Sequence, residues 1–127
     1  MNIRKLDLNK DYHIVEDWWK QRHWTPVTKE ALSMNGYIVE DIAAMWLYLS
    51  VGSKLAWIGF PIANPNTTKE QRNDAIDLLF NTIHEYAKTN GYDFIITTSN
   101  IPAVINRIEK IGYIKGDENV SHFWRKL

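Results

Sequence analysis

The 127-residue sequence contains no cysteine, which excludes disulfides, thiolate metal sites and cysteine nucleophiles. Its four histidines include no pair four residues apart, the helical spacing that brings two imidazoles to one metal ion. Charge of one sign does not dominate either, because fifteen basic residues balance fifteen acidic ones without a long run of either kind. We therefore expect no metal site and no nucleic-acid partner.

Long hydrophobic runs are also missing. The longest, residues 42–49, is far shorter than the roughly twenty residues that a membrane helix needs, and residues 1–5 contain no apolar region of the signal-peptide type. A chain of this length is expected to form one hydrophobic core. We predict a single soluble, cytoplasmic domain over residues 1–127 with no membrane partner.

Glycine is scarce in the second half of the chain, where none lies between Gly59 and Gly91. This stretch nevertheless has the layout of an anion site, with an apolar strand followed by a short loop and a long helix. Backbone N–H groups and the helix dipole at such a junction can hold phosphate. Thr67 and Glu70 also have the spacing of a capping box, in which side chains take the N–H groups of the helix start. Both interpretations remain open.

The spacing of apolar residues and turn signals predicts an α/β chain whose elements follow a definite order. The expected elements are a strand at 3–8, a helix at 11–22, a shorter helix from 28, strands at 37–40, 43–50 and 54–62, a helix at 68–89, a buried strand at 93–98, a helix capped by Asn100 that ends before Gly112, and strands at 113–115 and 121–126. Pro61 lies inside the fourth strand just after Gly59, which predicts a β-bulge or the loss of a neighbouring strand there.

The ending of the last helix carries a resemblance. Asn100-x-x-Ala103 and Glu109-Lys110-Ile111-Gly112-Tyr113, together with the element order, resemble the GNAT acetyltransferase superfamily. Short phage-encoded members are the most similar, through Trp18-Trp19, Arg22-His23, Pro26-Val27 and Gly36-x-Ile38-Val39. The resemblance implies a GNAT-like fold, a mixed and mostly antiparallel sheet with helices on both faces. It also implies transfer of an acetyl group from acetyl-CoA to an amine.

In this superfamily acetyl-CoA lies between the fourth and fifth strands and against the helix start. The resemblance therefore assigns cofactor contacts to Phe60, Ile62, Ala63, Thr67, Thr68, Arg72, Asn73 and Asn100. Backbone N–H groups of the irregular strand would stabilise the oxyanion.

Two departures stand out. The superfamily's pyrophosphate motif places Gln or Arg, Gly, and Gly or Ala where this sequence has Glu70, Asn73 and Ala75. Asn73 could replace a glycine, because asparagine tolerates positive φ; Glu70 brings a carboxylate toward phosphate. Counting back from Gly112 places the superfamily's tyrosine general acid at Ile108, and counting forward from Asn100 places it at Arg107. Neither is a tyrosine, so the acid role is vacant or filled by another group.

The candidates for catalysis are His122, in the last expected strand, and His23, after the first helix. Either could deprotonate an amine near neutral pH, although a backbone-bonded strand histidine and a surface-loop histidine explain them as well. Trp19 and Trp24 are candidate walls of the acceptor site, and Glu40 could attract an amine, whereas a charged turn also accounts for Glu40.

Two functions are consistent with these observations. The first is an N-acetyltransferase that uses acetyl-CoA and acts on a small-molecule or protein amine. The alternative is a non-catalytic GNAT-like module that binds a protein partner, since fold alone does not choose between them. The sequence leaves a homodimer open.

Overall fold

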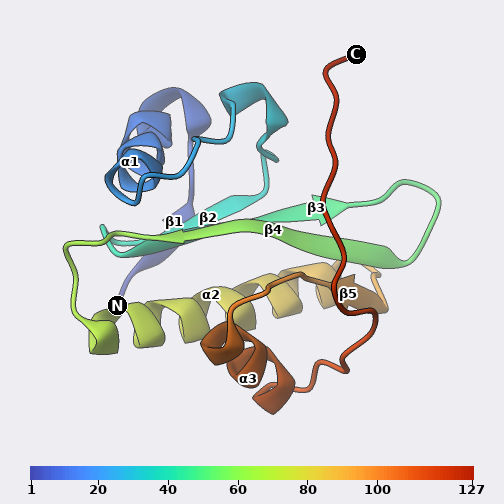
Figure 1. Cartoon of the computed structure of the whole chain (residues 1–127). Helices are drawn as coiled ribbons and strands as arrows, with labels where there is room; N and C mark the ends of the chain where they lie inside the picture. Colours follow the sequence, from blue (N-terminus) through green and yellow to red (C-terminus); the bar gives the residue numbers. More distant parts are fainter.

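A five-stranded sheet forms the centre of the structure, a computed structural model that describes all of residues 1–127 (Figure 1). The strands lie side by side in chain order, each antiparallel to the one before it except β5, which is parallel to β4. The mixed, mostly antiparallel sheet is therefore confirmed. The strands are β1 (Ile3–Lys5), β2 (Gly36–Val39), β3 (Ala43–Leu49), β4 (Leu55–Ala63) and β5 (Phe94–Ile96).

Helices cover both faces of this sheet, as predicted. Helix α1 (Leu8–Gln21) lies over one face, and α2 (Lys69–Thr89) and α3 (Pro102–Lys110) lie on the other (Figure 1). A short 3-10 helix, η1 (Lys29–Ala31), takes the place of the second expected helix. None of the helices combines the length and apolar character needed to cross a membrane.

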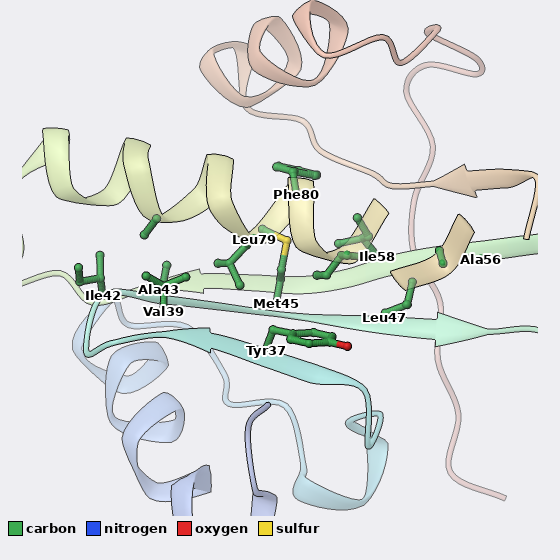
Figure 2. Packing of buried hydrophobic residues seen from close by; sticks show 13 residues of the cluster. Tyr37, Val39, Ile42, Ala43, Met45, Leu47, Ala56, Ile58, Leu79 and Phe80 are labelled. Atoms are coloured by element: carbon green, nitrogen blue, oxygen red, sulfur yellow. The ribbon is translucent and has the colours of Figure 1, made fainter. Parts of the chain in front are cut away.

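The larger hydrophobic cluster lies between the sheet and α2 (Figure 2). The α2 residues on the sheet-facing stripe are Ala75, Leu79, Phe80, Ile83 and Ala87, all buried. They recur at three- and four-residue intervals, the period of one helix face. Their partners on the sheet include Tyr37, Val39, Met45, Leu47, Ala56 and Ile58 (Figure 2).

The second cluster lies under α1. Trp18 and Trp19 are both 3% exposed, and the ring of Trp19 stacks on that of Trp46 with 5.7 Å between centroids. Trp46 is fully buried, and its indole nitrogen has no hydrogen-bond partner. Only a residue without a side chain fits beside it: a Cβ at Gly36 would lie 2.4 Å from that nitrogen.

We expect Gly36→Ala to lower the free energy of unfolding by about 1–3 kcal/mol, the usual cost of overpacking a core. The added methyl would force the buried Trp46 ring out of its position. Chemical denaturation monitored by tryptophan fluorescence measures the change. Gly116→Ala is the matched control, because nothing lies within 4 Å of the Cβ it would add; equal stability of the two variants would contradict the packing described here.

The predicted bulge is present in β4. Gly59 and Ile62 are three positions apart, but their partners on β3 are only two apart, so β4 carries an extra residue. Phe60, inside this interval, has a φ of 55°, a left-handed conformation that is uncommon for a bulky residue. Pro61 follows it and has no N–H to donate to a ladder. The bulge bends the strand where the sheet narrows.

Several expected boundaries were wrong. Helix α1 begins earlier than predicted, because Asp7 is its N-cap and its side chain accepts from the Asn9 N–H. Strand β5 is shorter than predicted and not buried, since Phe94 is 68% exposed. The strands expected at 113–115 and 121–126 do not form, because neither segment has a pairing partner in the sheet.

Candidate functional site

Strand β4 continues well past the end of β5 (Figure 1). The last parallel pair is Trp57 with Ile96, and beyond it the Thr97 hydroxyl donates a hydrogen bond to the Ile58 carbonyl over 3.2 Å. From the bulge to Ala63, the β5 side of β4 therefore has no strand partner. Unpaired backbone groups along an edge are ready donors and acceptors for another molecule.

The loop after β4 is held by its own hydrogen bonds. Asn64 is buried, and its side chain donates to the Asp41 carbonyl and accepts from the Asn66 N–H, at 2.8 and 2.9 Å. The Thr67 hydroxyl donates to the Asn64 carbonyl at 2.7 Å, so its hydrogen is not free for a phosphate. This network fixes the direction in which α2 begins.

The capping box exists, but one residue later than predicted. Thr68 is the N-cap; its hydroxyl accepts from the Gln71 N–H at 3.1 Å, while the Gln71 side chain accepts from the Thr68 N–H at 2.9 Å. Glu70 therefore takes no part in the cap. The N–H groups of Lys69 and Glu70, at the first two helical positions, have no partner in the protein. Two amides at the positive end of the helix dipole remain for an anion.

The lack of glycine has little consequence for this loop. No residue between Phe60 and Gly91 has a positive φ, so the backbone here uses only conformations open to any residue. Asn73 and Ala75 lie inside α2, where Ala75 is fully buried. The prediction that Asn73 supplies a left-handed backbone at a phosphate loop is therefore wrong. Its carbonyl and side-chain oxygens accept instead from Arg107 of α3, at 3.3 and 2.5 Å.

Two arginines face the loop without a carboxylate partner. Arg22, just after α1, donates from Nε to the Ala63 carbonyl at 2.9 Å, and Arg72 donates to the Thr67 carbonyl. Neither forms an ion pair. Burial, together with the positive charge of Arg72, lowers the pKa of Arg22. Two uncompensated guanidinium groups beside free helix-start amides form a site suited to an anion.

Asn100 and His122 lie in a different group. Both line a groove of about 630 Å³ between the loop after β5, α3 and the C-terminal segment. The prediction that Asn100 caps α3 is wrong. Ile101 is the N-cap residue, and its N–H donates to the Ser99 hydroxyl at 3.1 Å. His122 is exposed on the rim. The structure thus places one catalytic candidate beside one cofactor candidate, on the α3 side.

The remaining candidates are dispersed. Trp19 is in the core, so its predicted role as a pocket wall is wrong. His23 has a φ of 59° in the turn after α1, and Trp24, 49% exposed, lies 5.6 Å from the Arg22 guanidinium. Glu40 lies in the β2–β3 turn and accepts from the Asn2 N–H at 2.9 Å.

The side chains of the bulge are apolar and divide between two environments. Phe60 is partly exposed and packs edge-on against Tyr48 and Trp57, with centroids 6.1 and 5.7 Å apart. Ile62 is buried under α1. The side chain of Ile62 is therefore not available to a ligand, whereas Phe60 offers part of its ring.

Tyr113, which replaces the phenylalanine of the resembled motif, is tied to α2. Its hydroxyl shares a 2.6 Å hydrogen bond with His84 Nε2, and its ring packs on Phe80. Burial raises the pKa of Tyr113 to about 12 and lowers the pKa of His84. The pair joins the end of α3 to α2 and holds the start of the C-terminal segment.

Because folding lowers the pKa of His84, the unfolded chain binds this proton more readily than the folded one. We therefore expect the free energy of unfolding to be highest above the unfolded pKa of about 6.5 and to fall as the pH drops below it. Urea titrations between about pH 7.5 and 5 measure this slope. His84→Gln should flatten it, whereas His13→Gln, on an exposed part of α1, should not; an unchanged slope in His84→Gln would contradict the assignment.

Sequence reasoning missed Arg22 and Arg107. Arg22 lies 41 positions before its partner Ala63, so no local motif connects it to the loop. Arg107 was considered only as the position of a missing tyrosine, whereas its contacts with Asn73 and Asp77 show that it joins α3 to α2.

Comparison with known proteins identifies solved structures with the same fold. No family model and no curated protein matches the sequence. Among solved structures, aminoglycoside N-acetyltransferase AAC(6')-Iy in complex with CoA matches 99% of this chain and all of its own, with a TM-score of 0.65 and 11% identity. Glucosamine-6-phosphate N-acetyltransferase from Arabidopsis thaliana matches over 98% of both chains, with a TM-score of 0.60 and 12% identity.

A third match, a transcriptional regulator from Bacillus halodurans, has a TM-score of 0.67 at 14% identity over 97% of this chain and 99% of that one. At these identities the likeness concerns the fold alone. The element order, the β4–β5 arrangement and these matches agree with the prediction made from the sequence: the chain has the GNAT N-acetyltransferase fold.

Proposed function

We propose that the chain is an N-acetyltransferase that moves the acetyl group of acetyl-CoA to a small-molecule amine. The observation that carries this proposal is the junction of two features: β4 runs unpaired past β5, and it ends at a loop with two arginines that have no carboxylate partner. One feature suits an extended amide-containing chain and the other suits phosphate. CoA contains both.

The residues present fit the cofactor's charge. Arg22, Arg72 and the free amides of Lys69 and Glu70 would hold the phosphates. The unpaired edge from Phe60 to Ala63 would bind the amide-containing arm, as a strand binds an extended peptide. The Glu70 carboxylate is exposed and points to no partner, so it opposes this charge only through solvent.

Acetyl-CoA supplies an activated thioester. The chain's own contribution would be to bind it, to orient the acetyl group with backbone donors of the bulge, and to remove a proton from the amine. A bond forms between the amine nitrogen and the acyl carbon, the carbon–sulfur bond breaks, and the amine's proton passes to a base while the thiolate gains one from solvent. His122 and His23 are the candidate bases. No tyrosine acid is required, because a thiolate is a good leaving group.

The chemical class proposed for the acceptor is based on the solved structures that share this fold. Two of the matched structures are described as acetyltransferases of aminoglycosides and of glucosamine 6-phosphate, both amino sugars. We extend this to the present chain only as far as a polar small-molecule amine. Trp24 and Glu40 remain the candidates to contact it.

The test is a thermal-shift measurement with acetyl-CoA. At about one hundred times its dissociation constant, a ligand that binds only the folded state stabilises it by roughly 2.7 kcal/mol, which raises the melting temperature by several degrees. Acetylation of an amino-sugar panel, followed by release of free thiol, then tests turnover. Failure to bind at millimolar acetyl-CoA would favour the alternative, a non-catalytic module that binds a protein partner.

For catalysis, we expect His122→Ala to lower kcat about 10²–10⁴-fold, the range for loss of a general base. Cofactor affinity should change little, because the groove that His122 lines includes neither of the two arginines nor the loop after β4. Initial rates and calorimetric titration separate the two effects. His13→Ala, on exposed α1, is the control; an unchanged kcat in His122→Ala would remove this residue from the mechanism.

A further inference from the structure

The turn after α1 is a helix ending of a defined type that brings Trp24 back toward Arg22. Arg22 is the C-cap residue, and His23 after it has a φ of 59°, the left-handed conformation common at this position. The His23 N–H donates to the Lys20 carbonyl over 3.0 Å, and the Trp24 N–H donates over the same distance to the carbonyl of Trp19. These two bonds define a Schellman motif. The motif turns the chain back, so the Trp24 ring lies 5.6 Å from the Arg22 guanidinium.

The Arg22 guanidinium is fixed at two places and free at a third. Its Nε–H donates to the Ala63 carbonyl over 2.9 Å, and its central carbon lies over the Trp24 ring. Its two Nη groups take part in no hydrogen bond or ion pair within the chain. Two adjacent N–H groups of a planar guanidinium match two oxygens of one phosphate. Holding the side chain still before the anion arrives lowers the entropy that is lost on binding.

A second connection holds the end of α1 against the loop after β4. Gln21, the last residue of α1, accepts through Oε1 from the Asn66 side chain over 2.9 Å. Its Nε2 donates to the Asp17 carboxylate over 2.6 Å, and this charge-assisted bond fixes which end of the amide faces Asn66. The Asn66 N–H in turn donates to the buried Asn64 side chain. The backbone that carries Arg22 is therefore tied to the loop without use of the guanidinium.

We propose that Gln21 and Trp24, which flank Arg22 in the sequence, position Arg22 for the phosphates of CoA, an inference that rests on the proposed function. Each acts through Arg22 rather than on the cofactor: Gln21 holds the backbone, and Trp24 holds the face of the guanidinium. The same loop sets the other side of the phosphate site, because the Thr67 hydroxyl donates to the Asn64 carbonyl just before α2 begins. One loop thus fixes the guanidinium and the free amides of α2 relative to each other.

Trp24→Leu and Gln21→Ala are each expected to raise the dissociation constant of CoA about two- to fivefold, the effect of losing one cation–π contact or one hydrogen bond. Trp24→Phe keeps an aromatic face and should restore most of the affinity, whereas leucine fills space without attracting a cation. Glu16→Gln is the matched control on the same helix, because it breaks an ion pair with Lys20 that does not reach the loop. Isothermal titration calorimetry measures these constants.

Two further measurements separate positioning of Arg22 from general support of the fold. In an Arg22→Gln background, Trp24→Leu and Gln21→Ala should change CoA affinity no further, because they act through the residue already removed. Acetylated pantetheine, which has no phosphates, should bind all of these proteins equally. The KM for the amine should also stay the same. A higher KM for the amine in Trp24→Leu, with unaltered CoA affinity, would make Trp24 a wall of the acceptor site and overturn its positioning role.

Hydrogen exchange of the Arg22 Nε–H, followed by NMR without any cofactor, tests the positioning directly. Exchange should be about two- to fivefold faster in Trp24→Leu and Gln21→Ala than in the wild type, and unchanged in Glu16→Gln. Equal exchange in all four proteins, or effects on CoA affinity that persist without Arg22, would overturn the proposal. Wild-type CoA binding with indifferent variants would remove only the positioning, whereas a wild type that binds no CoA would remove the proposed function as well.

Discussion

Replacing both arginines at the β4–α2 loop, Arg22→Gln with Arg72→Gln, is expected to raise the dissociation constant of CoA about a thousandfold. Each guanidinium is held by a backbone carbonyl rather than a carboxylate, so its charge is available to the cofactor phosphates. A hydrogen bond to a charged group contributes about 1.5–3 kcal/mol, and every 1.4 kcal/mol is tenfold in affinity. Isothermal titration calorimetry measures the loss, and each single variant should give a part of it.

Two controls separate phosphate recognition from damage to the fold. Lys88→Gln removes the same charge from the last turn of α2, at the far end of the helix from the loop, and should leave CoA affinity unchanged. Acetylated pantetheine without phosphates should bind the wild type and the double variant equally. Equal affinity of the wild type and the double variant for CoA would show that the phosphates lie elsewhere. Glu70→Gln should act in the opposite direction, because it removes the acidic side chain from the first turn of α2, where the free amides lie.

The strength of CoA binding should also depend on salt. Arg72 is only partly buried, and interactions of such charges are screened over about 10 Å at 0.1 M ionic strength. The wild-type affinity should therefore decline with added salt more steeply than that of the double variant. The two curves should converge at high salt.

The sequence predicted most of the fold because its signals there are local. The period of α2 and the Gly59–Pro61 irregularity each depend on neighbouring residues, and each is present in the structure. The final strands were wrong for a different reason. A strand forms only by pairing with another strand, and residues 119–127 pair with none of the five strands.

The candidate site was predicted less well, because it depends on contacts between distant segments. Arg22 reaches the loop from the end of α1, and no spacing rule connects them. The superfamily motif placed Asn73 at a left-handed position, but Thr68 begins the helix early enough to enclose Asn73 in regular helix. An aromatic residue such as Trp19 could line a pocket or pack in the core. Its stacking on Trp46 shows that it packs in the core, and this contact between distant segments could not be predicted from the sequence.

The largest effect on stability is expected from Leu79→Ala. Leu79 is fully buried in the middle of α2 and contacts the sheet in the larger core (Figure 2). Removing a buried leucine side chain costs its transfer free energy and leaves a cavity, together about 2.7–5 kcal/mol. A domain of this size has about 5–15 kcal/mol in total, so the variant should unfold at a much lower urea concentration.

Helix α2 holds the anion loop at one end and the His84–Tyr113 pair near the other, so its packing on the sheet connects stability to the site. Leu79→Met, which keeps the volume, should cost less than about 1.5 kcal/mol, and Val51→Ala, at a fully exposed turn position, should cost almost nothing. If Leu79→Ala lost no more than Val51→Ala, the side chain would not be packed between α2 and the sheet. CoA at saturating concentration should recover part of the loss in Leu79→Ala, because ligand binding to the folded state offsets destabilisation wherever the change is made.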